Sequence, residues 1–181
     1  MTTATEVFSS GYRADEDHSW FEASIEHMGV GPFKARFADV EATLSVGPDG
    51  LGLEGRAAIE SISIRNPPEF REHVLNGDDF FDASHYAVIR FASTAIELLE
   101  GDQIAVRGEL TIKDTTKPIT ARGTYRTPVV DPFGRTRSSI DLSTTIDRRE
   151  FGLAWQMPRP DGGDALGWDV TIEVHLELVR A

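Results

Sequence analysis

Hydrophobic and polar residues alternate along most of the chain, which is the pattern of strands that bury one face. Residues 19–28 place apolar side chains and His27 on one face, with acidic and hydroxyl side chains on the other. Residues 33–46 alternate in the same way until the phase slips by one residue near Asp39. A β-bulge or a sharp bend accounts for such a slip. A long strand that bends favours a barrel over a flat sheet.

The same alternation predicts six further strands. They cover residues 51–63, 87–99, 102–113, 116–129, 136–148 and 168–179. The turn signals GPDG and DPFG, at 47–50 and 131–134, separate neighbouring strands. The connections are too short for crossover helices, so parallel βαβ units are excluded. The chain is therefore predicted to be all-β, with about eight antiparallel strands in a barrel or a sandwich.

One segment has helical instead of alternating spacing. Prolines begin it, a glycine follows it, and Phe70, Val74 and Leu75 fall at helical intervals, which predicts one short inserted helix over residues 68–76. The motif DDFF comes directly after it and places Phe80 and Phe81 between acidic residues. Neighbouring side chains in an extended corner point to opposite sides. We therefore expect one phenylalanine to pack under the helix and the other to point toward the barrel.

Length and charge narrow the functional classes. The 181 residues suit a single domain, 1–181, with a flexible tail expected over residues 1–10. The net charge of −12 argues against nucleic acid and against electrostatic binding to anionic membranes. No apolar run approaches the roughly 20 residues of a membrane span, so we expect no integral membrane association. The first ten residues lack the features of a secretory signal, from which we expect a cytoplasmic protein.

Motifs for catalysis are absent from the sequence. There is no cysteine, and the five histidines have no zinc-ligand spacing, so neither a metal nor a cofactor is predicted. GxSxG and GxGxxG are also missing. One enzymatic alternative stays open, a small hydrolase or stress-response enzyme that uses His27 with Asp141 or Asp147. A second alternative is a barrel with a filled core that serves as a scaffold or oligomerisation module, because alternation does not distinguish a filled barrel from a hollow one.

Six segments, in order along residues 12–179, carry a resemblance to a known family. They are HSWFEASIEHMGV at 18–30, REHVLNGDDFF at 71–81, IRFAS at 89–93, GELTIKDTTKPI at 108–119, DPFGRTR at 131–137 and DRREFGLAW at 147–155. They resemble the YceI-like family of lipid-binding proteins. The resemblance implies an eight-stranded, lipocalin-like antiparallel barrel around an elongated apolar cavity, and some members are similar to isoprenoid or quinone carriers. Ala23 stands where the family usually has phenylalanine, which would enlarge or reshape the lumen.

The leading hypothesis is non-enzymatic binding or carriage of a long apolar lipid, a polyisoprenoid or an isoprenoid quinone. Such a chain in water costs roughly 25 cal/mol per Å² of exposed apolar surface, and an apolar barrel removes that cost. The predicted lining is Phe21, Ile25, His27, Phe33, Phe37, Phe91, Leu110, Ile140 and Trp155. Four further side chains are expected to plug or gate one end: Phe70, Leu75, Phe80 and Phe81. A homodimer is one of the assemblies that the sequence leaves open.

Overall fold

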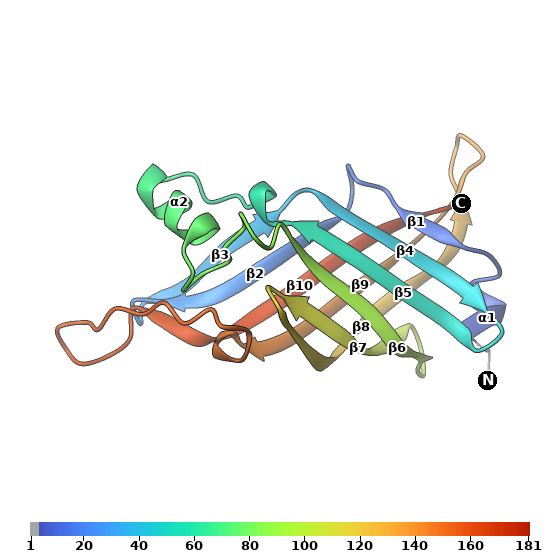
Figure 1. The fold of residues 1–181 in the computed structure, drawn as a ribbon. Coiled ribbons are helices and arrows are strands. Elements are labelled where there is room, and N and C mark those ends of the chain that lie inside the picture. The colour runs from blue at the N-terminus through green and yellow to red at the C-terminus, as the bar shows by residue number, and fades with distance from the viewer. Residues whose placement is uncertain (1–3) are drawn as a thin grey trace.

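The computed structural model describes residues 4–181, which form ten strands, two α-helices and two short 3-10 helices (Figure 1). The strands are β1 (Tyr12–Ala14), β2 (Trp20–His27), β3 (Gly31–Phe37), β4 (Val40–Gly47), β5 (Gly50–Ala58), β6 (Val88–Leu98), β7 (Gln103–Ile112), β8 (Thr115–Val130), β9 (Thr136–Asp147) and β10 (Leu166–Arg180). The helices are α1 (Ala4–Val7), η1 (Ile59–Ser61), α2 (Pro68–Asn76) and η2 (Arg148–Phe151). None of the helices within these residues is long and apolar enough to cross a membrane.

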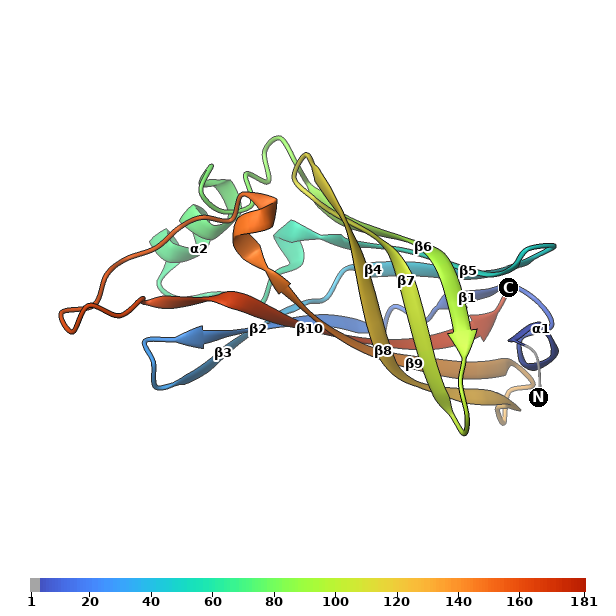
Figure 2. The ribbon, with the colours of Figure 1, turned by 90° about the horizontal axis from the view of Figure 1, so that it is seen from below.

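Eight strands close into the predicted antiparallel barrel. The ring runs β1-β4-β5-β6-β7-β8-β9-β10 and closes where β10 pairs with β1, with Arg180 opposite Tyr12. The β2–β3 hairpin extends the barrel wall at the other end of β10, because β2 pairs there with residues 166–175. Figures 1 and 2 show an elongated molecule, with α2 and this hairpin at one end and both termini at the other.

The predicted bend near Asp39 is confirmed as the junction between β3 and β4. Phe37 and Val40 are both buried on either side of the two-residue break, so the inward face changes phase there. The backbone oxygen of Asp39 accepts a hydrogen bond of 2.9 Å from the Ala58 N–H, which holds the bend against the end of β5. At this bend the chain therefore passes from the β2–β3 hairpin into β4, which belongs to the closed ring.

The ring includes β1, which the sequence does not predict, and leaves out β2, which it does. Two of the predicted strands also end early. The strand expected over 51–63 ends at Ala58, because Ile59 and Ile62 are both buried at a spacing of three, which suits a helical turn and not alternation. The strand expected to include Arg148 ends one residue earlier and continues as η2. There the Asp147 side chain accepts the backbone N–H of Arg149 at 2.9 Å and starts the turn.

The start of the chain is packed, whereas the sequence suggests a flexible tail over residues 1–10. Residues 4–7 form α1, and Phe8 is fully buried in the core. The Phe8 ring contacts Tyr12 edge-on, with ring centroids 5.7 Å apart, and lies 6.0 Å from Tyr125. Residues 1–3 lie outside the described residues. The packed part of the domain therefore begins before the first strand.

The barrel is filled at the end that holds the termini. The largest fully buried side chains of that end come from β1, β4, β7, β9, β10 and the segment after α1. They are Phe8, Tyr12, Leu44, Ile104, Val106, Ile140 and Leu178. These residues belong to one continuous hydrophobic cluster. Their packing stabilises the barrel from the end that holds the termini.

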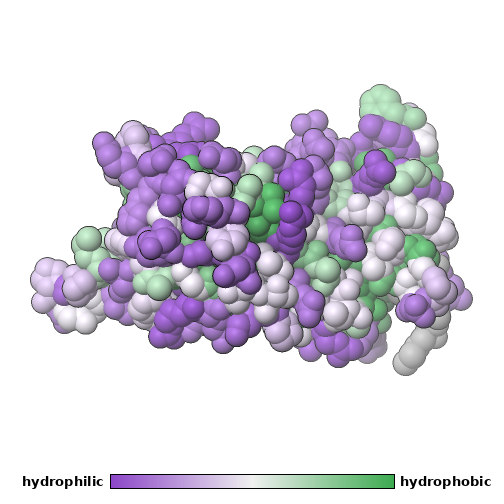
Figure 3. Space-filling model, in the orientation of Figure 1, coloured by the Kyte–Doolittle hydropathy of each residue, from purple (hydrophilic) through white to green (hydrophobic). Residues whose placement is uncertain are grey.

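Helix α2 lies over the opposite end, with the predicted bounds Pro68–Asn76. Proline occupies its first turn, Gly77 follows it, and Val74 and Leu75 are buried on its inner side. Its outer side is hydrophilic, as is most of the face drawn in Figure 3, in keeping with a net charge of −12. The helix therefore acts as a cover between solvent and the barrel end.

Candidate functional site

The most prominent feature under α2 is an apolar cavity of about 510 Å³, here called the main cavity. It lies between the β2–β3 hairpin, α2, the corner after α2, the start of β10 and residues 153–157. Aliphatic and aromatic side chains make up nearly all of its wall. Its volume falls in the roughly 300–1,000 Å³ range of small-molecule sites. This end of the barrel is therefore shaped to hold an apolar molecule.

A second cavity of about 100 Å³, the inner cavity, lies farther toward the filled end. Phe21, Ile89 and Ile172 belong to the walls of both cavities, so the two meet at these side chains. Strand β10 lines the whole path, from Leu166 in the main cavity to Leu176 in the inner one. At about 3.3 Å per residue this path is roughly 30 Å long along the strand. The two cavities therefore follow each other along β10 and meet at a waist formed by these three shared side chains.

Eleven of the thirteen side chains that the sequence nominates line one of the two cavities. Nine line the main cavity: Phe21, Ile25, His27, Phe33, Phe37, Phe70, Phe80, Phe81 and Trp155. Phe91 and Leu110 line the inner cavity. Two do not. Ile140 is fully buried in the filled end, and Leu75 packs under α2 without reaching either cavity. Alternation gives the face of a strand on which a side chain lies, but not its height along the barrel.

The two phenylalanines of the DDFF corner point in the two directions expected of them. Phe80 packs under the helix, with its ring edge-on to Phe70 at 6.3 Å and stacked on Trp155 at 5.6 Å. Phe81 points toward the barrel, with its ring edge-on to Phe37 at 6.0 Å. The Asp79 carboxylate contacts the His73 ring at 2.8 Å and so ties this corner to α2. Both rings also line the main cavity, so the corner forms one of its walls.

His27 lies at the exposed rim of the main cavity, in the register position opposite Leu166. Its ring lies 6.3 Å from that of Phe33. The carboxylates proposed to assist it have other partners, since Asp141 contacts His175 at 2.6 Å and Asp147 binds Arg149. Within residues 4–181, neither carboxylate contacts His27. The geometry offers no support for a histidine–carboxylate pair at this position.

Several side chains of the main cavity wall were not predicted, and Arg148 is the one among them that carries a charge. Arg148 is only 3% exposed and is part of the wall of the main cavity. Its Nε donates to the Gly167 oxygen at 2.8 Å, and its Nη1 donates to the Leu153 oxygen at 2.5 Å. The guanidinium carbon lies 4.2 Å from the centre of the Trp168 ring. The motif DRREFGLAW contains this arginine, but two adjacent arginines give no sign of which one turns inward.

The electrostatics of Arg148 are unusual for a cavity with an apolar wall. Burial lowers the pKa of its guanidinium, although nearby Asp147 and Asp164 act in the opposite direction. Among the described residues, its Nη2 is buried and has no hydrogen-bond partner, and no carboxylate forms an ion pair with it. An arginine stays protonated in proteins. The wall of the cavity therefore contains a buried positive charge with one unused donor group.

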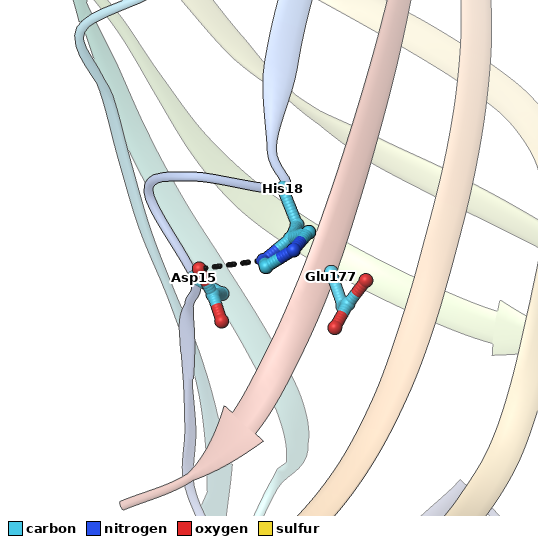
Figure 4. A group of neighbouring side chains, drawn as sticks. All are labelled: Asp15, His18 and Glu177. Carbon is cyan, nitrogen blue, oxygen red and sulfur yellow. Dashed lines mark ion pairs between the residues drawn. The ribbon is translucent and has the colours of Figure 1, made fainter.

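A group of side chains with potential metal ligands lies elsewhere, between the β1–β2 connection and β10. Figure 4 shows Asp15, His18 and Glu177, with the carboxylate of Asp15 3.0 Å from the His18 ring. Arg137 donates to Asp15 at 2.8 Å and to Glu177 at 2.5 Å. These bonds lower the pKa of Asp15, and Asp15 in turn raises the pKa of His18. Arg137 bridges the two carboxylates, so the group is an ion-pair network that ties β9 and β10 to the β1–β2 connection.

Curated relatives align with this chain over nearly their whole length. A UPF0312 protein of Pseudomonas fluorescens (strain SBW25) is 25% identical over 185 residues, which cover 99% of this chain and 92% of the relative. A UPF0312 protein of Pseudomonas syringae pv. tomato is 24% identical, and the match covers 96% of this chain and 90% of that one. The similarity is therefore not confined to the cavity or to one motif.

Solved structures show the same fold. BcnA of Burkholderia cenocepacia superposes with a TM-score of 0.72 at 22% identity, covering 93% of this chain and 99% of that chain. A polyisoprenoid-binding domain from Saccharophagus degradans, described as implicated in plant cell wall breakdown, gives a TM-score of 0.67 at 12% identity, covering 94% and 98%. The model of the YceI-like domain matches residues 12–178, so this chain belongs to the YceI-like family, as the six sequence segments indicate.

Proposed function

We propose that this protein is a non-enzymatic binder or carrier of a long apolar lipid, with a polyisoprenoid or an isoprenoid quinone as the ligand class. The observation that carries the proposal is that the two apolar cavities follow each other along β10 and meet at a shared waist. A long unbranched or prenylated chain fits a space of this shape better than a compact ligand does. The polyisoprenoid-binding domain of the same fold supports the choice of ligand class.

The energy of binding would come mainly from removing the ligand chain from water. Each buried CH₂ contributes about 0.8 kcal/mol, so about twenty such groups supply roughly 16 kcal/mol, which exceeds the roughly 4–15 kcal/mol cost of association. No directional bond is needed along the chain, which agrees with a wall made almost entirely of hydrocarbon. The affinity of such a site depends mainly on the length of the ligand chain and less on its end group.

The position of Trp155 in the cavity wall provides a direct test. A polyprenyl quinone bound in the main cavity would quench the fluorescence of Trp155 in a saturable manner. Trp155→Phe should reduce the quenching, and Trp168, which packs on Arg148 in the same wall, accounts for the remainder. Trp20→Phe should leave the quenching unchanged, because Trp20 stacks on His175 and Arg36 outside both cavities. Absence of saturable quenching in the unmodified protein would count against the proposal.

A filled-core scaffold is not favoured, because the packed core occupies only one end of the barrel. The hydrolase alternative is not favoured either, since His27 lacks the carboxylate partner that it would need among the described residues. A cytoplasmic location and a homodimer remain expectations that size-exclusion chromatography and fractionation of the host can test. The protein therefore acts, in this proposal, by sequestering its ligand and not by transforming it.

A further inference from the structure

The inference starts from the unused donor of Arg148 and rests on the proposed function. A buried charged group normally has all its donors bonded, because an unpaired one costs free energy in an apolar setting. Arg148 uses Nε and Nη1 for backbone carbonyls, while Nη2 has no partner in residues 4–181. No other charged side chain is fully buried in that range. The protein thus keeps one buried charged donor in a wall whose other polar side chains are His27, at the exposed rim, and Asn66.

The surroundings of Arg148 fix it in place. Two backbone carbonyls, from residues on either side of the 153–167 segment, bind the guanidinium, and the Trp168 ring covers one of its faces. The Trp168 indole is itself held by Asp164, which accepts its N–H at 2.9 Å. These contacts order the guanidinium before a ligand binds, so a bound acceptor has to uncover the buried Nη2 but does not have to order the side chain.

The position of Arg148 along the cavity suits contact with one end of a bound lipid and not with its middle. Gly167, to which Arg148 is bonded, directly follows Leu166, and Leu166 lies opposite His27 at the exposed rim. From there β10 leads inward past Val170 to the waist at Ile172. An end group at Arg148 would therefore lie just inside the rim, with the apolar chain directed toward the inner cavity.

We propose that Arg148 binds a hydrogen-bond-accepting oxygen at one end of the bound lipid, so that the protein selects chains with an oxygen-bearing head group over plain hydrocarbons. A carbonyl, a hydroxyl and an anionic phosphate oxygen share this chemistry. Hydrogen bonds that involve a charged partner are shorter and stronger than neutral ones. The end group thus supplies the acceptor that Nη2 lacks, and its position sets the direction of the chain.

The test compares three ligands of equal chain length on the full chain: a polyprenyl quinone, a polyprenyl phosphate and a hydrocarbon without oxygen. The unmodified protein is expected to bind at least one oxygen-bearing ligand about 10- to 100-fold more tightly than the hydrocarbon. Preference for the phosphate alone assigns an anionic head group, and equal preference for quinone and phosphate assigns any acceptor oxygen. Equal affinity for all three ligands would overturn this inference while leaving the proposed function intact.

Failure of all three ligands to bind would instead remove the proposed function. Variants then locate the donor. Arg148→Met should abolish the preference while keeping affinity for the hydrocarbon, and Arg149→Met, one residue away on the exposed side, should keep the preference. If Arg148 had only a structural role, Arg148→Met would weaken the binding of all three ligands to the same extent. Because the comparison of ligands on the unmodified protein stands alone, the inference can be refuted even if Arg148→Met does not fold.

Discussion

Ala23 offers the sharpest perturbation of the cavity, because it lies at the waist between the two cavities. It lines the main cavity and sits opposite Ile172, which belongs to both walls. Its neighbour across the hairpin is Ala35, also a small side chain. Ala23→Trp should therefore fill the waist and close the path to the inner cavity, with the new ring packed against Ile172.

The size of the effect follows from the number of ligand carbons that the new ring displaces. If about four carbons lose their place, the loss is about 3 kcal/mol, or on the order of 100-fold in affinity. A short chain that ends before Ile172 should lose little. The stability of the folded protein should stay similar or rise, because a buried aromatic side chain removes apolar area from water.

The assay is a titration of prenyl quinones of increasing length, with Ser24→Trp as the matched control. Ser24 is the next residue on β2 but does not belong to the wall of either cavity. In Ala23→Trp the affinity should no longer rise as the prenyl chain lengthens, whereas in Ser24→Trp it should still rise. Unchanged binding of the long chain to Ala23→Trp, or equal loss in the control, would refute the reasoning.

Three further predictions concern the framework of the barrel. Leu178→Ala, in the filled end, should lower the free energy of unfolding by about 2–5 kcal/mol in urea and leave ligand affinity unchanged. Gly123→Ala should destabilise the barrel by at least about 3 kcal/mol, because its Cβ would lie 1.8 Å from a backbone oxygen of the facing strand, whereas Gly31→Ala has open space and should be near neutral. Arg137 lowers the pKa of Asp131 to about 2, so this carboxylate stabilises the fold above its ordinary pKa of 3.8, and the contribution disappears as the pH falls through 2. Unfolding curves of Asp131→Asn should therefore differ from those of the unmodified protein near neutral pH and converge with them at about pH 2.

Alternation is sufficient to predict the strand faces and the bend between β3 and β4. At Asp39 the change of phase is visible in the residues themselves, and the structure places a break there. Phe80 and Phe81 do point in opposite directions, but residues 78–81 form a hydrogen-bonded turn and not the extended corner on which that prediction rested. The strand faces and the bend depend on residues that are adjacent in the sequence, so the alternation of apolar and polar residues is enough to predict them.

Other features depend on the third dimension. Ile140 has the inward face that its strand pattern predicts, yet its height along the barrel places it in the filled end. Phe8 lies in a short apolar segment with no periodicity, and only its contact with Tyr12 and Tyr125 makes it part of the core. Arg148 and Arg149 are equivalent in the sequence, and only the η2 turn buries the first and exposes the second.

The central claim is that the protein holds a long apolar molecule inside the barrel. Native mass spectrometry of the protein purified from its own host, followed by extraction into organic solvent, tests it most directly. The account predicts a bound mass that is lost on extraction and that belongs to a prenylated or similarly long chain with an oxygen-bearing end. A protein that emerges without such a mass, and acquires none after incubation with polyprenyl quinone, would contradict the account.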